Sequence, residues 1–171
     1  MSWFEALAEW IEKRGGKRQI FRTEKDLEPK LYLERFYIIK CPLLEVMIHR
    51  FYMSDLPVPH DHPWASCNVI LKGGYIEHVV QKNIETAHFR KPGYFGRRLA
   101  DAQHWVELPE GLMGEVWTLF VTFRREKSWG FFTEDRYYPF EEYFRLTGVD
   151  TVNHSAEDYR GWLFPARSPN S

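Results

Sequence analysis

Short runs of strand-forming residues, separated by turn residues, constrain the fold of this chain more than any other sequence feature. The runs are rich in β-branched and aromatic side chains, and Gly, Pro or Asp residues stand between them. Strands at roughly ten-residue spacing within one domain predict an antiparallel all-β barrel or sandwich. The expected strands are Leu31–Ile39, Glu45–Met53, Ser66–Leu71, Tyr75–Val80, Thr86–Arg90, Tyr94–Arg98, His104–Glu107 and Val116–Phe123.

Helical segments are expected at both ends of this β region. Near the N-terminus, Ser2 and Glu5 have the spacing of a capping box, and Gly15-Gly16 stops the helix. A second, short helix is expected to start at Pro139 and to end at Gly148. The apolar face expected for the first helix consists of Trp3, Leu7, Trp10 and Ile11.

These features divide the chain into three parts. We expect an amphipathic helix over 1–16 packed on the barrel, the barrel with its C-terminal helix over 30–148, and a C-terminal extension over 149–171. The pair Gly73-Gly74 predicts a tight hairpin, and Trp162-Leu163-Phe164 is expected to dock on the body. A basic zone follows the first helix and is interpreted as solvated surface: Lys13, Arg14, Lys17, Arg18 and Arg22.

Composition excludes several classes of protein. The 171 residues are 44% hydrophobic, which is too apolar for a disordered chain, and no run of about 18 apolar residues predicts a membrane span. The net charge of −1 argues against a nucleic-acid binder. The N-terminal residues carry three glutamates and no basic start, unlike a secretory signal. Two cysteines fit a reducing compartment, so we expect a cytoplasmic protein.

The most informative segment is Pro59-His60-Asp61-His62-Pro63-Trp64. Two histidines at i and i+2 on an extended segment project to the same side, and imidazole is the commonest metal ligand in proteins. His104 opens another expected strand 42 residues after His62, so the chain can return beside the pair. The sequence therefore predicts a metal site made by His60, His62 and His104. The flanking prolines leave the alternative that the pair lies on a surface loop.

These motifs resemble those of the cupin superfamily, whose fold is a double-stranded β-helix, an antiparallel jelly-roll barrel. The first cupin motif is His-x-His followed by a hairpin glycine, and the second supplies another His; here they correspond to His60, His62, Gly73 and His104. The chain is most similar to small bacterial and phage-type cupins with His-Asp-His-Pro-Trp, Lys-Gly-Gly-Tyr, Val-Trp-Thr-Leu and Trp-Gly-Phe segments. The resemblance implies an all-β fold with three histidine ligands, and a homodimer.

One position departs from the usual cupin pattern. The family's glutamate ligand would fall near Ser66 or Cys67, and neither is acidic. The resulting three-histidine set is similar to the iron site of thiol dioxygenases, which also place a cysteine five residues after the second histidine, as Cys67 is here. That cysteine cross-links to a tyrosine in the animal enzymes. The alternative, that Cys67 is a small buried apolar residue, is favoured.

The ligand set indicates the chemistry. Three neutral imidazoles leave a divalent cation its full charge and open positions for a substrate. Fe²⁺ is the expected metal, with Zn²⁺, Ni²⁺ and Mn²⁺ as alternatives, since imidazole binds most first-row metals. The leading hypothesis is an iron(II) oxygenase that acts on a small molecule. The alternatives are a non-redox isomerase, epimerase or lyase, and a non-catalytic ligand-binding or structural protein.

Further residues are candidates for the substrate pocket. Arg97 and Arg98 precede His104 on one expected strand, so one of them should point inward, where it could clamp an anionic substrate. Aromatic residues in a β-rich core are more often packing than pocket lining. His49 is a reserve ligand, because it lies on the strand before the motif. The pocket candidates are Cys67, Asn68, Tyr94, Arg98 and Trp117.

Overall fold

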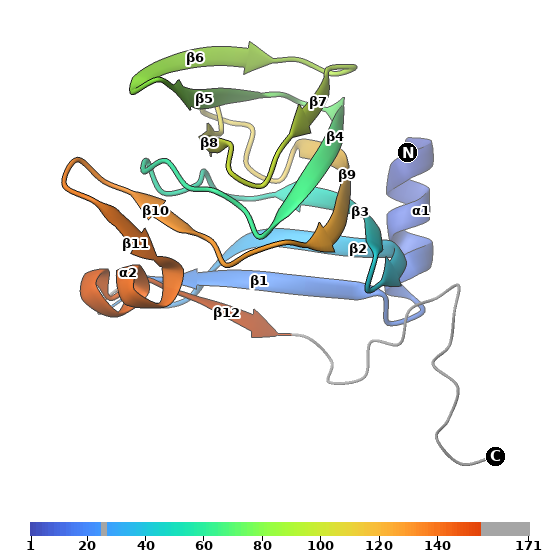
Figure 1. Ribbon diagram of the computed structural model, residues 1–171. Helices are drawn as coiled ribbons and strands as arrows, with labels where there is room; N and C mark the ends of the chain where they lie inside the picture. Colours follow the sequence, from blue (N-terminus) through green and yellow to red (C-terminus); the bar gives the residue numbers. More distant parts are fainter. Residues whose placement is uncertain (25–26, 155–171) are drawn as a thin grey trace.

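The computed structural model describes residues 1–24 and 27–154 (Figure 1). Its elements occur in the following order along the chain. They are α1 (Trp3–Glu12), β1 (Lys17–Thr23), β2 (Lys30–Cys41), β3 (Leu44–Phe51), β4 (Trp64–Lys72), β5 (Tyr75–Gln81), β6 (Ile84–Arg90), β7 (Phe95–Arg98), β8 (Gln103–Glu107), β9 (Val116–Arg125), β10 (Gly130–Phe132), β11 (Tyr137–Pro139), α2 (Phe140–Thr147) and β12 (Asp150–His154).

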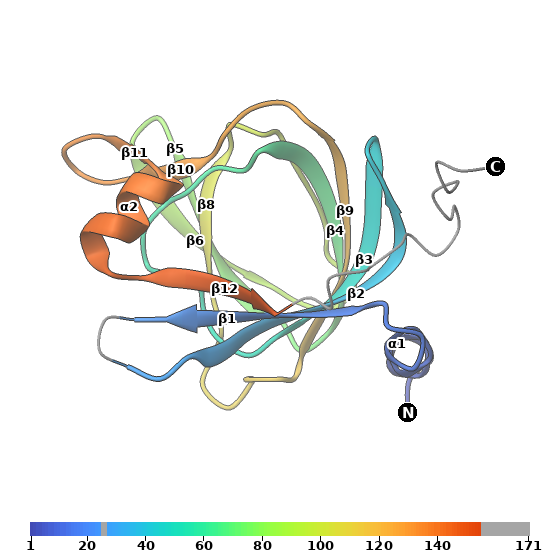
Figure 2. The ribbon, with the colours of Figure 1, turned by 90° about the horizontal axis from the view of Figure 1, so that it is seen from below.

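Two antiparallel sheets face each other and form the barrel. The larger sheet has the strand order β12-β1-β2-β3-β9-β4-β7, and the smaller has the order β6-β5-β8; β10 and β11 make a separate hairpin. Figure 2 shows β3, β4 and β9 on one side of the barrel and β5, β6 and β8 on the other. All eight expected strands are present. The prediction of an antiparallel all-β barrel with one N-terminal and one short C-terminal helix is confirmed.

The first helix packs against the outer face of the larger sheet (Figure 2). Its capping box is confirmed: the Ser2 hydroxyl accepts from the Glu5 N–H, and the Glu5 carboxylate accepts from the Ser2 N–H at 2.7 Å. The expected apolar face is partly wrong, because Trp3 and Trp10 are 63% and 47% exposed. The helix is rotated so that positions i, i+4 and i+7 meet the sheet, and the buried cluster there is Phe4, Ala8, Ile11, Phe36, Ile48 and Trp117.

The central strands of the larger sheet are buried on both faces. On β3 and β9, Ile48 and Trp117 face α1, whereas His49 and Thr118 face the interior of the barrel. This follows from the two-residue period of a strand. A second buried cluster consists of Ile70, Tyr75, Val106, Leu108 and Val116, and two of its members, Tyr75 and Val106, line the same cavity as the histidines.

The turn predicted at Gly73-Gly74 has a different role from the one expected. β4 pairs with β7 and β9, and β5 pairs with β6 and β8, so the two glycines carry the chain from one sheet to the other. Both have positive φ, and a Cβ at either would lie 2.8 Å from a backbone carbonyl oxygen. A tight hairpin occurs instead at Lys82-Asn83, where both residues have positive φ and join β5 to β6.

Four short strands were not expected from the sequence. β1 lies in the basic zone that was interpreted as solvated surface, yet it pairs with both β2 and β12. β10 and β11 form a hairpin beside α2, where Trp129 stacks on Phe140 and Phe131 stacks on Tyr143. The expected second helix is confirmed and ends at Gly148, in the left-handed conformation.

The apolar patch at 162–164 lies outside the described residues. Neither described helix has the length and apolar character needed to cross a membrane.

Candidate metal centre

The three histidines singled out in the sequence come together inside the barrel. His60 and His62 lie on the segment before β4, and His104 lies on β8. Two backbone hydrogen bonds join His60 to His104, with N···O distances of 3.0 and 3.1 Å, and the N–H of His62 donates to the carbonyl of Ala100. Backbone pairing therefore holds the two stretches of chain against each other independently of any ion.

The residue between the two histidines turns to the opposite side. Asp61 is 2% exposed, and its carboxylate accepts a 2.8 Å hydrogen bond from the N–H of Gly130 and pairs with Lys127. Because side chains alternate along an extended segment, anchoring Asp61 to the β10 hairpin directs His60 and His62 into the barrel together.

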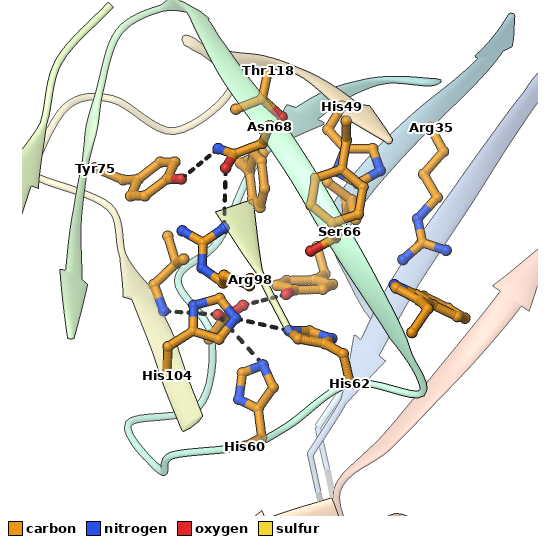
Figure 3. Close-up of a pocket in the computed structure, with 17 residues that line it drawn as sticks. Arg35, His49, His60, His62, Ser66, Asn68, Tyr75, Arg98, His104 and Thr118 are labelled. Carbon is orange, nitrogen blue, oxygen red and sulfur yellow. Dashed lines mark hydrogen bonds and ion pairs between the residues drawn. The ribbon is translucent and has the colours of Figure 1, made fainter. Parts of the chain in front are cut away.

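The geometry of the rings fits one shared cation. The candidate ligand nitrogens of His60, His62 and His104 all lie within 4.8 Å of one another, and the Nε2 atoms of His62 and His104 are 2.8 Å apart. Two imidazole nitrogens bound to one ion at about 2.1 Å lie roughly 3 Å apart. One pair is thus already at the required separation, and Figure 3 shows the His60 ring beside the other two.

A carboxylate stands behind the ring of His104, and a backbone carbonyl stands behind the ring of His60. An oxygen of Glu77 on β5 lies 3.3 Å from Nδ1 of His104, close but outside strict hydrogen-bond geometry, which leaves Nε2 directed at His62. Nδ1 of His60 lies 3.3 Å from the carbonyl oxygen of Val58. An oxygen of Asp55 lies 3.9 Å from Nε2 of the same ring and accepts from the N–H of Val106. A carboxylate or carbonyl behind an imidazole ligand orients the ring in metal sites.

The environment keeps two of the imidazoles neutral. Burial lowers the pKa of His104 to about 4, although the carboxylate of Glu77 acts in the opposite direction. Burial also holds the pKa of His62 well below its usual range, and the neighbouring His104 and His60 add to the effect. A neutral imidazole keeps a lone pair for a metal, so both rings can act as ligands at neutral pH.

The histidines line a cavity of about 100 Å³ inside the barrel (Figure 3). This volume is several times the space that one buried water needs, so the cavity suits a small molecule. Aromatic and polar side chains are mixed on its walls. The lining residues are Tyr32, Leu33, Arg35, His49, Phe51, Asp55, His60, His62, Trp64, Ser66, Asn68, Tyr75, Arg98, His104, Val106, Thr118 and Phe120.

Two of the five pocket candidates line this cavity. Asn68 and Arg98 face inward, and Arg97 is exposed, as the alternation of the strand requires. Each nitrogen of the Arg98 guanidinium already bonds a protein group, however: Nε and Nη2 donate to Glu77, and Nη1 donates to the side-chain oxygen of Asn68 at 3.0 Å. Arg98 therefore holds the cavity wall together, and its donors are not directed at a ligand.

The other three candidates do not line the cavity, which corrects the prediction. Cys67 lies between Ser66 and Asn68 on β4, and since both of these face the cavity, Cys67 faces the other side of the sheet. Trp117 alternates with Thr118 and packs under α1. Tyr94 packs against the second buried cluster, and its ring stacks under Arg90.

Sequence reasoning missed several residues of the site. Glu77, Asp55 and Arg35 all contact or line it; Glu77 and Arg35 lie on strands distant in sequence from the histidine motif, whereas Asp55 lies only five residues before His60. The one available signal was an acidic residue at an inward position of a strand, because Tyr75 and Glu77 share a face of β5. His49, the reserve ligand, does line the cavity but stacks on Phe120 at 4.7 Å, outside the three-histidine cluster.

Comparison with known proteins finds likeness at the level of structure. No family model and no curated protein matches the chain. The hydroxypropylphosphonic acid epoxidase from S. wedmorenis is 13% identical with a TM-score of 0.45, over 54% of this chain and 51% of that one. KdgF from Halomonas sp. is 16% identical with a TM-score of 0.44, over 60% and 89% of the two chains. A cupin superfamily protein from Desulfitobacterium hafniense is 11% identical with a TM-score of 0.43, over 54% and 77%.

The chain matches about half the length of the epoxidase. The strand order of this structure, its two facing antiparallel sheets and the histidines between them are features of the molecule itself. Together they make the fold a barrel of two facing antiparallel sheets with a cluster of three histidines inside it.

Proposed function

We propose that this protein is a metal-dependent enzyme that holds Fe²⁺ through His60, His62 and His104 and oxidises a small molecule in the barrel with dioxygen. The observation that supports it most directly is the convergence of the three imidazoles within 4.8 Å. An iron(II) ion in such a site supplies a Lewis acid with open positions for a substrate and for dioxygen.

The chain's own residues would prepare the site. Glu77 lies at Nδ1 of His104 and favours the tautomer with its proton there, so that the Nε2 lone pair faces the ion. Arg98 holds the Glu77 carboxylate in place from the cavity wall. Phe51 and Phe120 cover part of the cavity with apolar surface, which limits water beside the reacting atoms.

A small-molecule substrate, a homodimer and a cytoplasmic location belong to the same proposal. The cavity volume supports a small-molecule substrate. The homodimer follows from the resemblance to cupins. The cytoplasmic location follows from the two free cysteines, Cys41 and Cys67.

The first experiment measures metal content. Elemental analysis of the purified protein should find about one transition-metal ion per chain, and His62→Ala should retain almost none, because two imidazoles bind a divalent ion far more weakly than three. His88→Ala is the matched control, since His88 is exposed and bonds only the Thr86 hydroxyl among the described residues. A wild-type protein that takes up no metal after reconstitution would overturn the proposal.

The second experiment separates oxygenase from Lewis-acid chemistry. Oxygen uptake by the Fe²⁺-loaded protein should rise above the background of free Fe²⁺ with at least one member of a panel of small organic acids, and His60→Ala should lose this increase. Metal-dependent conversion of a panel member under anaerobic conditions would instead assign the site to an isomerase or a lyase.

A further inference from the structure

Four polar residues form a row across the face of the larger sheet that faces the barrel interior. Arg18 on β1 is paired with Arg35 on β2, Arg35 with His49 on β3, and His49 with Thr118 on β9. Directly paired residues of antiparallel strands place their side chains on the same face. Three members of this row, Arg35, His49 and Thr118, line the cavity that contains the histidine cluster.

Every member of the row carries a buried polar atom that lacks a hydrogen-bond partner among the described residues. These atoms are Nε of Arg18, Nε of Arg35, Nε2 of His49 and Oγ1 of Thr118. The indole N–H of Trp64, which lines the same cavity, is in the same condition. Buried polar groups are nearly always hydrogen-bonded in native proteins, so several orphans around one cavity point to a ligand that bonds them.

The row is also positively charged without compensation. Arg18 and Arg35 are neighbours in register, and among the side chains described for residues 1–24 and 27–149 no carboxylate lies within ion-pair distance of either. A guanidinium has five donors and no acceptor. Arg98, on the opposite side of the cavity, differs from Arg35 because its charge is paired with the carboxylate of Glu77. Water could satisfy hydrogen bonds at Arg35 but could not supply the missing charge.

Two details define the site's position relative to the histidines. His49 and Thr118 are 3% and 1% exposed, and the ring of His49 is held by stacking on Phe120. Figure 3 shows Arg35 and His49 on the side of the cavity nearer to His62 than to His104. A molecule held at Arg35 would therefore extend toward the histidine cluster.

We propose that Arg35, with Thr118, His49 and Trp64, binds the oxyanion group of a small organic acid, a carboxylate or a phosphoryl group, and so presents the rest of the molecule to the metal. This assignment of a substrate class rests on the proposed function, since it is the metal that makes the bound acid a substrate. The planar fork of Arg35 supplies charge and paired donors, and Arg18 adds positive potential from the neighbouring strand.

Calorimetric titration with two probes, acetate and inorganic phosphate, tests the site in metal-loaded and metal-stripped protein. At least one probe should bind wild-type protein with a millimolar or lower Kd. Arg35→Met, which keeps most of the side-chain volume, should weaken that binding at least tenfold, and Arg35→Lys should give an intermediate loss. Thr118→Val, nearly isosteric, should weaken it several-fold. The control is Arg97→Met, because Arg97 is exposed and outside the cavity.

The outcomes separate this inference from the proposed function. The probe that binds with the lower Kd identifies the preferred oxyanion as a carboxylate or a phosphoryl group. Metal content should be unchanged in Arg35→Met, since Arg35 is no ligand. If wild-type protein takes up no metal but binds a probe through Arg35, the oxyanion site stands and the metal enzyme falls. If neither probe binds wild-type protein, or if Arg35→Met and Thr118→Val both bind as wild type does, the oxyanion site is overturned.

Discussion

A single carboxylate, Glu77, connects the metal ligands to the wall of the cavity. Its oxygens accept from Arg90 at 2.9 Å and from Arg98, and one of them lies beside His104. Burial by itself would raise the pKa of this carboxyl, but His104 and the two arginines together hold the pKa well below its usual range. Glu77 is thus ionised at neutral pH, and its charge is what permits Arg98 to be buried.

Glu77→Gln should therefore damage both stability and metal binding. Removing one partner of a buried ion pair leaves Arg98 uncompensated, and we expect the free energy of unfolding to fall by about 3 kcal/mol. Loss of the carboxylate behind a histidine ligand should weaken metal affinity about 10- to 100-fold. Urea denaturation and competition with a chelator measure the two effects. Glu107→Gln is the control: Glu107 bonds His78 and is half-exposed, so little change is expected.

The alternation of side chains along a strand predicts the orientation of a residue only in part. The two-residue period correctly separates Arg98 from Arg97, but it does not tell which face of a strand is the interior. By residue type alone, Cys67 and Trp117 look as suitable for a pocket as Ser66 and Thr118 do. The tertiary structure distinguishes them: Ser66 and Thr118 line the cavity, and α1 covers Trp117 on the outer face.

At the scale of elements, the β10–β11 hairpin stabilises the histidine segment. Besides the contact of Gly130 with Asp61, the carbonyl of Pro59 accepts from the N–H of Phe132 at 2.8 Å. Just after β9, the N–H of Glu126 donates to the carbonyl of Pro63 at 2.7 Å. The segment 59–63 is not a strand, so these bonds replace the ladder that would otherwise fix its direction.

Asp61→Ala should loosen this attachment. The Gly130 N–H loses its buried acceptor, and we expect a loss of about 2 kcal/mol in the free energy of unfolding. Metal affinity should fall as well, because His60 and His62 flank the released residue. Differential scanning calorimetry and metal titration measure these effects. The control Asp101→Ala removes an exposed carboxylate and should change neither. Unaltered metal affinity in Asp61→Ala would show that the hairpin does not orient the histidines.

At the scale of the whole molecule, facing sheets bury several imidazoles in one barrel. Burial holds the pKa of His49 and of His62 well below the usual range, and that of His104 at about 4. On unfolding, these rings return to the ordinary pKa near 6.5. Between about pH 6.5 and 4, the unfolded chain therefore binds more protons than the folded protein does, and stability rises with pH across this window.

We expect the metal-stripped protein to lose stability on acidification from pH 7 to 5. Each buried imidazole contributes up to about 1.4 kcal/mol per pH unit below 6.5. Urea denaturation at pH 7, 6 and 5 measures the slope. His49→Gln should reduce it without removing a proposed metal ligand, whereas His88→Gln, at an exposed position, should leave it unchanged. A free energy of unfolding that is flat over this range would contradict the burial of neutral imidazoles.

The sequence alone determined the elements whose signals are local. The capping box, the eight central strands and the spacing of the histidine motifs all follow from side-chain type and period, because these act over a few residues. The tertiary structure decided what depends on distant chain segments: β1 became a paired strand because β2 and β12 lie beside it, and Gly73-Gly74 joined two sheets. It also brought Glu77 to His104 and Arg35 to His49, since burial and pairing between distant strands determine which charges meet in the barrel.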